Sequence, residues 1–123
     1  MEKNRKQRPI LPDDLVKGDL TEEELLQNEV IRPIIKLQSD LIKAIVLNQL
    51  KGMNVDLNSM DQFKRKKQIN SLFQKNQQFK REIIGMVIGQ FDLNELDTYF
   101  KFQKEINRRI VQIAGNRMVD QLA

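Results

Sequence analysis

The sequence contains no cysteine and no histidine. The lack of thiols excludes disulfides, thiolate metal sites, iron–sulfur clusters and cysteine nucleophiles. The lack of imidazoles removes the side chain that most often binds metals and transfers protons near neutral pH. The chain also has no glycine-rich phosphate loop and no serine elbow. We therefore expect a protein that is not an enzyme and that uses no cofactor or metal.

Long hydrophobic runs are also missing. The longest strongly apolar stretches, residues 44–47 and 83–88, are far shorter than the roughly 20 residues that a membrane-spanning helix needs. The basic residues at the N-terminus are followed by prolines and aspartates, and no apolar segment typical of a signal peptide follows them. We therefore expect a cytoplasmic protein without integral membrane association.

Glycine and proline are scarce, with 5 and 3 residues among 123, while 31% of the chain is charged and 40% is hydrophobic. This composition is typical of a helix-rich globular domain. Residues 1–20 contain two of the prolines, mixed charges and no hydrophobic periodicity. The sequence therefore predicts a flexible, extended N-terminal arm at 1–20 and a single helical domain at 21–123.

Three sequence motifs predict where helices begin. Each is a capping box, in which a side chain at the helix N-terminus and a Glu or Gln three residues later bond each other's backbone N–H groups. The boxes are Thr21–Glu24, Ser59–Gln62 and Asp92–Glu95. Apolar residues recur at helical spacing after each one, so the fold class predicted is all-α, a small bundle of about four helices.

The first helix is expected to run from residue 21 to about residue 50, and the last one from residue 93 almost to the C-terminus. Pro33 lies inside the first pattern, and it either kinks this helix or opens its main part as a first-turn residue. The third helix, residues 77–89, is apolar around most of its circumference and should be the most buried. Its glycines, Gly85 and Gly89, should let a neighbouring helix approach closely.

Polar side chains are expected within the apolar faces of the two long helices. On a helical wheel, Gln27, Gln38 and Gln49 project near the middle of the first apolar face. The corresponding stripe of the last helix carries Gln103, Arg117 and Gln121. Buried amides need hydrogen-bond partners. These residues are therefore predicted to bond between helices and fix their register, to form a subunit interface, or to line a polar pocket for a small ligand.

The basic excess is concentrated in one segment. Residues 52–91 carry a net charge of +4, which equals the net charge of the whole chain. The candidate anion-binding residues there are Lys64, Arg65, Lys66, Lys67, Lys80 and Arg81. At helical spacing the first four point in different directions, and the chain has no tryptophan and a single tyrosine for base stacking. A solvated helix surface is favoured, with a nucleic-acid site as the alternative.

Charged residues on the other side of the first helix have the spacing of ion pairs. They are Glu29, Arg32, Lys36, Asp40 and Lys43, which follow one another at intervals of three or four residues. Such pairs on a helix surface stabilise it by tenths of a kcal/mol. We interpret them as exposed ion pairs without a catalytic role.

Several short segments resemble a known group of proteins. These segments include Arg32-Pro33-Ile34-Ile35-Lys36 and Gly85-Met86-Val87-Ile88-Gly89. They are similar to segments of short, uncharacterised proteins of Bacteroidetes-type bacteria that often carry the label glyoxalase. That label implies metal-dependent chemistry with histidine and glutamate ligands on a βαβββ scaffold. Because this chain has no histidine and no strand pattern, we do not expect it to share that activity.

The function predicted from these patterns is a helical protein–protein interaction or structural module. The apolar helix faces exceed what a four-helix core of this length needs, so we expect the chain to associate with itself, as a homodimer, or with another protein. The alternative is a small, basic nucleic-acid-binding accessory protein that uses Lys64–Lys67 and the N-terminal arm.

Overall fold

The computed structural model describes residues 21–123, so the predicted N-terminal arm lies outside the described residues. The described chain is all-α, with helices and loops and no strand, as predicted. The expected number of about four helices is wrong, because residues 21–123 form six helices when α2, η1 and α3 are counted as one continuous helix. None of the helices in residues 21–123 combines the length and the apolar composition that a membrane span requires.

The first predicted helix consists of four segments. They are α2 (Glu22–Leu26), the π-helical turn η1 (Gln27–Ile31), α3 (Arg32–Leu37) and α4 (Ser39–Gly52). The predicted capping box at its start is confirmed: the N–H of Glu24 donates to Thr21 Oγ1 at 3.1 Å, and the N–H of Thr21 donates to Glu24 Oε1 at 3.0 Å. The hydrogen bond from the Thr21 N–H is the main cause that lowers the pKa of the Glu24 carboxyl.

Pro33 lies in the first turn of α3, which confirms the prediction that it is a first-turn residue. The π-turn before it closes with a wider hydrogen bond, from the N–H of Arg32 to the carbonyl of Gln27. Proline has no N–H and crowds the carbonyl four residues earlier, which here belongs to the π-turn. The wider turn therefore admits Pro33 into the first turn of α3. The bend lies further along, at Gln38, where φ is −92° and ψ is 8°.

The remaining elements follow the predicted order with shifted boundaries. They are the 3₁₀ turn η2 (Leu57–Ser59), α5 (Gln62–Lys75), α6 (Gln77–Ile88), α7 (Leu93–Lys101) and α8 (Gln103–Leu122). The capping box at Asp92 and Glu95 is confirmed. The one predicted at Ser59 is wrong, because Asp61 caps α5 by accepting a hydrogen bond from the N–H of Lys64 at 2.8 Å.

The last predicted helix is broken in two at Phe102, where φ is −127° and ψ is 33°. No proline or glycine marks this break in the sequence. The hydroxyl of Tyr99 donates to Asn107 Oδ1 at 2.6 Å and so joins the two helices across it. The change of direction brings α7 against α2, where Lys101 Nζ lies 3.2 Å from Glu22 Oε1.

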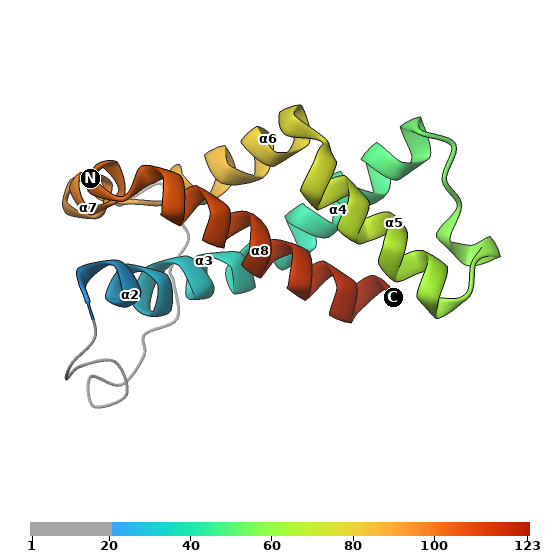
Figure 1. Cartoon of the computed structure of the whole chain (residues 1–123), viewed down its shortest axis with the longest axis horizontal. Helices are drawn as coiled ribbons and strands as arrows, with labels where there is room; N and C mark the ends of the chain where they lie inside the picture. The colour runs from blue at the N-terminus through green and yellow to red at the C-terminus, as the bar shows by residue number, and fades with distance from the viewer. Residues whose placement is uncertain (1–20) are drawn as a thin grey trace.

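Helix α8 is at the centre of the fold. It crosses the molecule and contacts α3, α4, α5, α6 and α7 (Figure 1). Its buried residues Ile106, Ile110, Ala114 and Met118 follow one another at intervals of four, which is one helical face. The prediction that the third helix would be the most buried is wrong, because α6 buries one face only.

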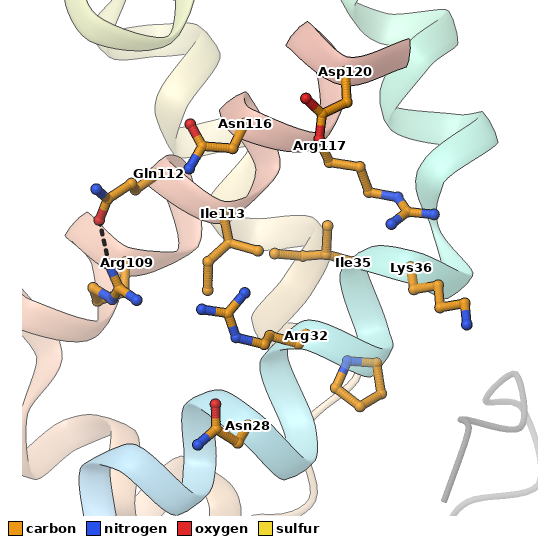
Figure 2. A pocket seen from close by; sticks show the side chains of 11 residues that line it. Asn28, Arg32, Ile35, Lys36, Arg109, Gln112, Ile113, Asn116, Arg117 and Asp120 are labelled. Atoms are coloured by element: carbon orange, nitrogen blue, oxygen red, sulfur yellow. Dashed lines mark hydrogen bonds between the residues drawn. The ribbon is translucent and has the colours of Figure 1, made fainter. Parts of the chain in front are cut away.

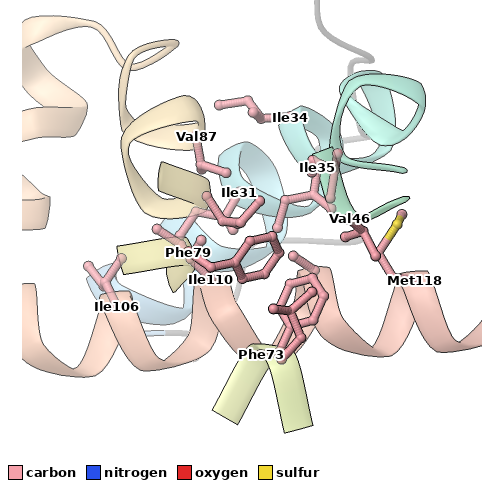
Figure 3. Close-up of a cluster of buried hydrophobic side chains, with 14 of the residues drawn as sticks. Ile31, Ile34, Ile35, Val46, Phe73, Phe79, Val87, Ile106, Ile110 and Met118 are labelled. Atoms are coloured by element: carbon pink, nitrogen blue, oxygen red, sulfur yellow. The ribbon is translucent and has the colours of Figure 1, made fainter. Parts of the chain in front are cut away.

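The hydrophobic core joins α8 to α5, α6 and α3 (Figure 3). Phe79 packs edge to face on Phe73, with ring centroids 4.9 Å apart. The close helix approach expected at Gly85 and Gly89 does not occur, since both are exposed. It occurs at Gly115 of α8, where a Cβ would lie 3.2 Å from Phe73 Cγ. A small residue there allows α5 to pack closely against α8.

Candidate functional site

A hollow of about 460 Å³ lies between α3 and α8, and we call it the α3–α8 groove (Figure 2). One wall comes from residues 28–36 and the other from residues 109–120. The volume is within the usual range of ligand-binding pockets. The groove therefore has the size of a binding site, and its walls come from segments far apart in the sequence.

Four basic side chains line this groove. Arg32 and Lys36 come from α3, and Arg109 and Arg117 come from α8, while Asp120 is the only acidic lining residue within 21–123. Figure 2 shows the four cations around the hollow, with Arg32 between Arg109 and Arg117 in this view. The groove therefore carries a clear excess of positive charge.

In the part of the chain that the structure describes, these cations form no ion pair. Within residues 21–123, the ion pairs are Lys101–Glu22 and Arg108–Glu105, and neither involves a groove residue. The expected pairing of Arg32 and Lys36 with their acidic neighbours on the same helix is therefore not found. Both side chains are exposed, and exposed pairs stabilise a helix too little to hold long side chains in one geometry.

The two arginines of α8 are held instead by neutral partners. Arg109 Nε donates to Gln27 Oε1 at 3.1 Å, and Arg109 Nη1 donates to Gln112 Oε1. Arg117 Nε donates to Ser39 Oγ, and this hydroxyl donates in turn to the Ile35 carbonyl at 3.1 Å. Amide and hydroxyl oxygens orient a guanidinium without neutralising it, and each guanidinium keeps free N–H donors.

The π-turn contributes to this arrangement. Gln27 is the first residue of the turn, and its backbone carbonyl accepts the wide hydrogen bond that precedes Pro33. Its side chain accepts the hydrogen bond from Arg109 of α8. Gln27 thus ties the local geometry of one wall to a cation of the other wall. Single π-turns in helices are often found at functional sites.

The floor of the groove is apolar and its rim is polar. Pro33 and Ile35 are buried, and Ile113 is half-buried. The amides that line the groove are Asn28, Gln112 and Asn116. Within residues 21–123, no three side chains of the metal-binding types converge as ligands would. The arrangement can bind a ligand that has both anionic and apolar groups.

Gln38 is buried but faces α6 instead of the groove. Its Nε2 donates to the Met86 carbonyl at 3.0 Å. Met86 is in the last turn of α6, where the neighbouring carbonyls of Gly85 and Val87 accept from the backbone N–H groups of Gly89 and Gln90. Helix ends leave carbonyls without backbone donors. The Gln38 side chain therefore caps the C-terminus of α6.

Replacing Gln38 by leucine should lower the free energy of unfolding by about 1–3 kcal/mol, because the Met86 carbonyl loses its side-chain donor. Urea unfolding monitored by circular dichroism measures this change. Gln49→Leu is the matched control, because Gln49 is half-buried and bonds no other described side chain. Equal losses in the two variants would contradict the capping role of Gln38.

The other predicted polar residues are divided among different surroundings. Arg117 lies in the groove, whereas Gln103 and Gln121 are exposed, so α8 does not bury them. Gln27 faces α8 and Gln38 faces α6, so the predicted common face of glutamines does not exist. The π-turn and the bend change the direction in which later side chains point around the helix axis. A helical wheel assumes a straight, regular α-helix and therefore includes neither change.

The basic residues predicted to bind anions do not converge. Lys64, Lys66 and Lys67 are exposed. Arg65 Nε donates to the Leu57 carbonyl at 2.8 Å and so holds the turn before α5. Arg81 is exposed on α6.

Lys80 lies apart from that run, in a separate hollow of about 330 Å³ that it shares with Arg108. The guanidinium of Arg108 is already paired with Glu105. A larger hollow of about 640 Å³ lies where α4 ends, and it is lined by Lys51, Arg65 and Asp56. Because Arg65 is bound to a backbone carbonyl there, this hollow has less free positive charge than the α3–α8 groove.

Among the groove cations, the apolar stripe of the last helix predicts Arg117 alone. The spacing of Arg32 and Lys36 predicts exposed ion pairs, and none of the sequence patterns above includes Arg109. The signal that could have found them is a spacing of four residues on each wall. It joins Asn28 to Arg32 and Lys36, and Arg109 to Arg117 through Ile113.

Comparisons with known proteins give no relative from which a function can be inferred. No protein-family model matches the chain, and neither a curated protein nor a solved structure matches it. The resemblance to proteins labelled glyoxalase therefore stays a prediction. The functional interpretation depends on the geometry and charge of the α3–α8 groove.

Proposed function

We propose that the protein is a helical interaction module that binds an anionic group of its partner in the α3–α8 groove. One observation carries this proposal: Arg109 and Arg117 are oriented by Gln27, Gln112 and Ser39, which are neutral. An arginine paired with a carboxylate is already neutralised, whereas these two retain their charge. They are therefore prepared to form charge-assisted hydrogen bonds with a ligand.

The groove supports binding better than catalysis. The lining that residues 21–123 supply consists of cations, amides, apolar side chains and a single carboxylate, and it includes no serine, threonine or tyrosine as a nucleophile. General acid–base catalysis needs a titratable group positioned to exchange a proton with the substrate. Asp120, the only carboxylate, lies at the exposed end of the groove and has no second acidic residue beside it in the lining.

Nuclear magnetic resonance titration of the full chain with inorganic pyrophosphate or citrate at low salt tests the proposal. Backbone amide signals of residues 28–36 and 109–120 should shift in a saturable manner, because these residues form the groove walls. The shifts should decrease as salt is added, since salt screens exposed charges. Saturable shifts confined to Lys64–Lys67 would contradict the proposal.

Self-association and nucleic-acid binding stay predictions. Exposed aromatic and aliphatic side chains support a protein interface outside the groove: Phe63 is 74% exposed, Leu93 80% and Phe100 62%. Leu93 and Phe100 are seven residues apart on α7 and thus share one helix face. The dispersed placement of Lys64–Lys67 favours the interaction module over the nucleic-acid alternative.

A further inference from the structure

We infer that the ligand of the α3–α8 groove is an extended acidic peptide, with two carboxylate side chains on either side of an apolar one. This inference rests on the proposed anion-binding function and adds the class of partner to it. The separation of the fixed cations, the surface between them and the volume of the groove support an extended acidic peptide.

The two oriented arginines lie at opposite ends of the groove. Arg109 and Arg117 are eight residues apart on α8, which corresponds to about 12 Å along the helix axis. Arg109 is held by Gln27 at the π-turn, and Arg117 is held by Ser39 beyond the end of α3. A single phosphate or carboxylate group is too small to reach both cations, so the arrangement fits a ligand with two separated anionic groups.

An extended peptide has a matching repeat. Residues i and i+4 of a strand lie about 13 Å apart, and residues i, i+2 and i+4 all face the same side. Acidic residues at i and i+4 would therefore reach Arg109 and Arg117. The residue at i+2 would meet Ile113, which is midway between them, and the apolar floor formed by Pro33 and Ile35.

The walls of the groove complete the match with a peptide main chain. Side-chain amides both donate and accept hydrogen bonds, and so do peptide groups. Asn28, Gln112 and Asn116 supply amides at the groove walls. Arg32 and Lys36, which are exposed on the opposite wall from the two fixed arginines, add positive charge toward the acidic side chains.

A helical peptide fits less well. Two turns of helix with a diameter of about 10–12 Å occupy roughly 1,000 Å³. The groove offers about 460 Å³. A bound helix would therefore lie largely outside the groove, and its side chains alone would reach the floor. An extended chain can place its main chain between the walls.

A nucleic acid also fits less well. Its backbone has a phosphate at every residue, which would place negative charge over the apolar floor between the two arginines. In the described part of the chain, none of the residues that line the groove is aromatic, so these walls offer bases no stacking surface. Asp120, near Arg117, would repel a polyanion that continued beyond the groove.

Fluorescence anisotropy with three labelled peptides tests this inference on the full chain. The first has a core of aspartate, serine, leucine, serine and aspartate. The second has the same composition with the two aspartates adjacent, and the third has serine in place of leucine. We expect the first peptide to bind at least tenfold more tightly than either of the others, because it alone matches both cations and the floor.

Matched variants of the protein locate the binding. Arg109→Gln and Arg117→Gln should each weaken binding of the first peptide about tenfold, whereas Lys66→Gln, which removes the same charge on α5, should leave it unchanged. Circular dichroism establishes that each variant is folded. If Arg117→Gln does not fold, Arg109→Gln and Ile113→Ala together give the same test. Ile113→Ala is expected to weaken binding of the first peptide more than binding of the third.

The outcomes separate this inference from the function on which it rests. If pyrophosphate or citrate binds in the groove but the three peptides bind equally or not at all, the inference of an acidic peptide ligand is wrong. The proposed anion-binding function is then retained. If neither the anions nor the peptides bind there, both are wrong. The labelled first peptide is also displaced with a single-stranded oligonucleotide and with the unlabelled peptide. If the oligonucleotide displaces it at the lower concentration, that result contradicts the acidic-peptide ligand and favours a nucleic acid.

Discussion

Replacing Arg32 by glutamate should weaken anion binding in the α3–α8 groove about 100-fold, which corresponds to about 2.7 kcal/mol. The substitution removes a cation and adds an anion on the wall of the groove, so the ligand loses attraction and gains repulsion. Arg32 is exposed and forms no ion pair within residues 21–123, so the fold should be unchanged. Isothermal titration calorimetry with pyrophosphate or citrate at low salt measures the affinity.

Lys66→Glu is the control for this prediction. It changes the net charge by the same amount but lies on α5, away from the groove, and Lys66 is exposed. Its effect on anion affinity should be limited to the change in long-range electrostatic attraction. Salt screens this attraction beyond about one Debye length, ~10 Å at 0.1 M salt. An equal loss of affinity in the two variants would show that net charge attracts the anion and that the groove does not bind it specifically.

Replacing Phe79 by alanine should lower the free energy of unfolding by about 3–5 kcal/mol. Phe79 is 1% exposed and packs edge to face on Phe73, so its removal leaves a cavity between α6 and α5. Small domains have a total stability of about 5–15 kcal/mol, so this loss would be a large share of it. Urea unfolding followed by circular dichroism measures the change.

Phe63→Ala is the matched control for Phe79→Ala. The same atoms are removed, but Phe63 is 74% exposed on α5 and contributes little buried area. Its free energy of unfolding should change by less than about 0.5 kcal/mol, as is usual for surface substitutions. A large loss in this variant would mean that Phe63 is covered, and it would support the predicted self-association. A small loss in Phe79→Ala would contradict the described core.

Local signals in the sequence predicted much of the secondary structure. The boxes at Thr21 and Asp92 begin helices where predicted, because a capping box satisfies backbone donors within a few residues and depends little on the rest of the chain. The box at Ser59 failed because Asp61, two residues later, is an equally suitable cap and leaves Ser59 in a 3₁₀ turn. Such neighbouring caps differ too little in energy for the sequence alone to choose between them.

The breaks within the long helices could not be predicted in the same way. At Gln38 and Phe102 the helical pattern continues on both sides, and no proline or glycine interrupts it. The bends accompany contacts between distant segments, such as the hydrogen bond from Gln38 to Met86 and the packing of α7 against α2. These partners are far along the chain, so the spacing of neighbouring residues does not reveal them.

The candidate site was predictable only in part, and the reason is again tertiary. The sequence placed Arg117 among apolar residues, which marked it as unusual. Arg32 and Lys36 have acidic neighbours at ion-pair spacing, so the local pattern predicts exposed ion pairs and does not indicate a binding site. What distinguishes them is that they face Arg109 and Arg117 on a helix nearly eighty residues away.

The sequence by itself determined the all-α class, the absence of cysteine and histidine chemistry, and the helix starts after Thr21 and Asp92, because these depend on composition, hydrophobic periodicity and capping over a few residues. Only the tertiary structure decided which helix is central and where the charges meet. Gly115 allows α5 to pack closely on α8, and the π-turn at Gln27 joins one groove wall to Arg109 of the other. Both features depend on packing between segments that are distant in sequence.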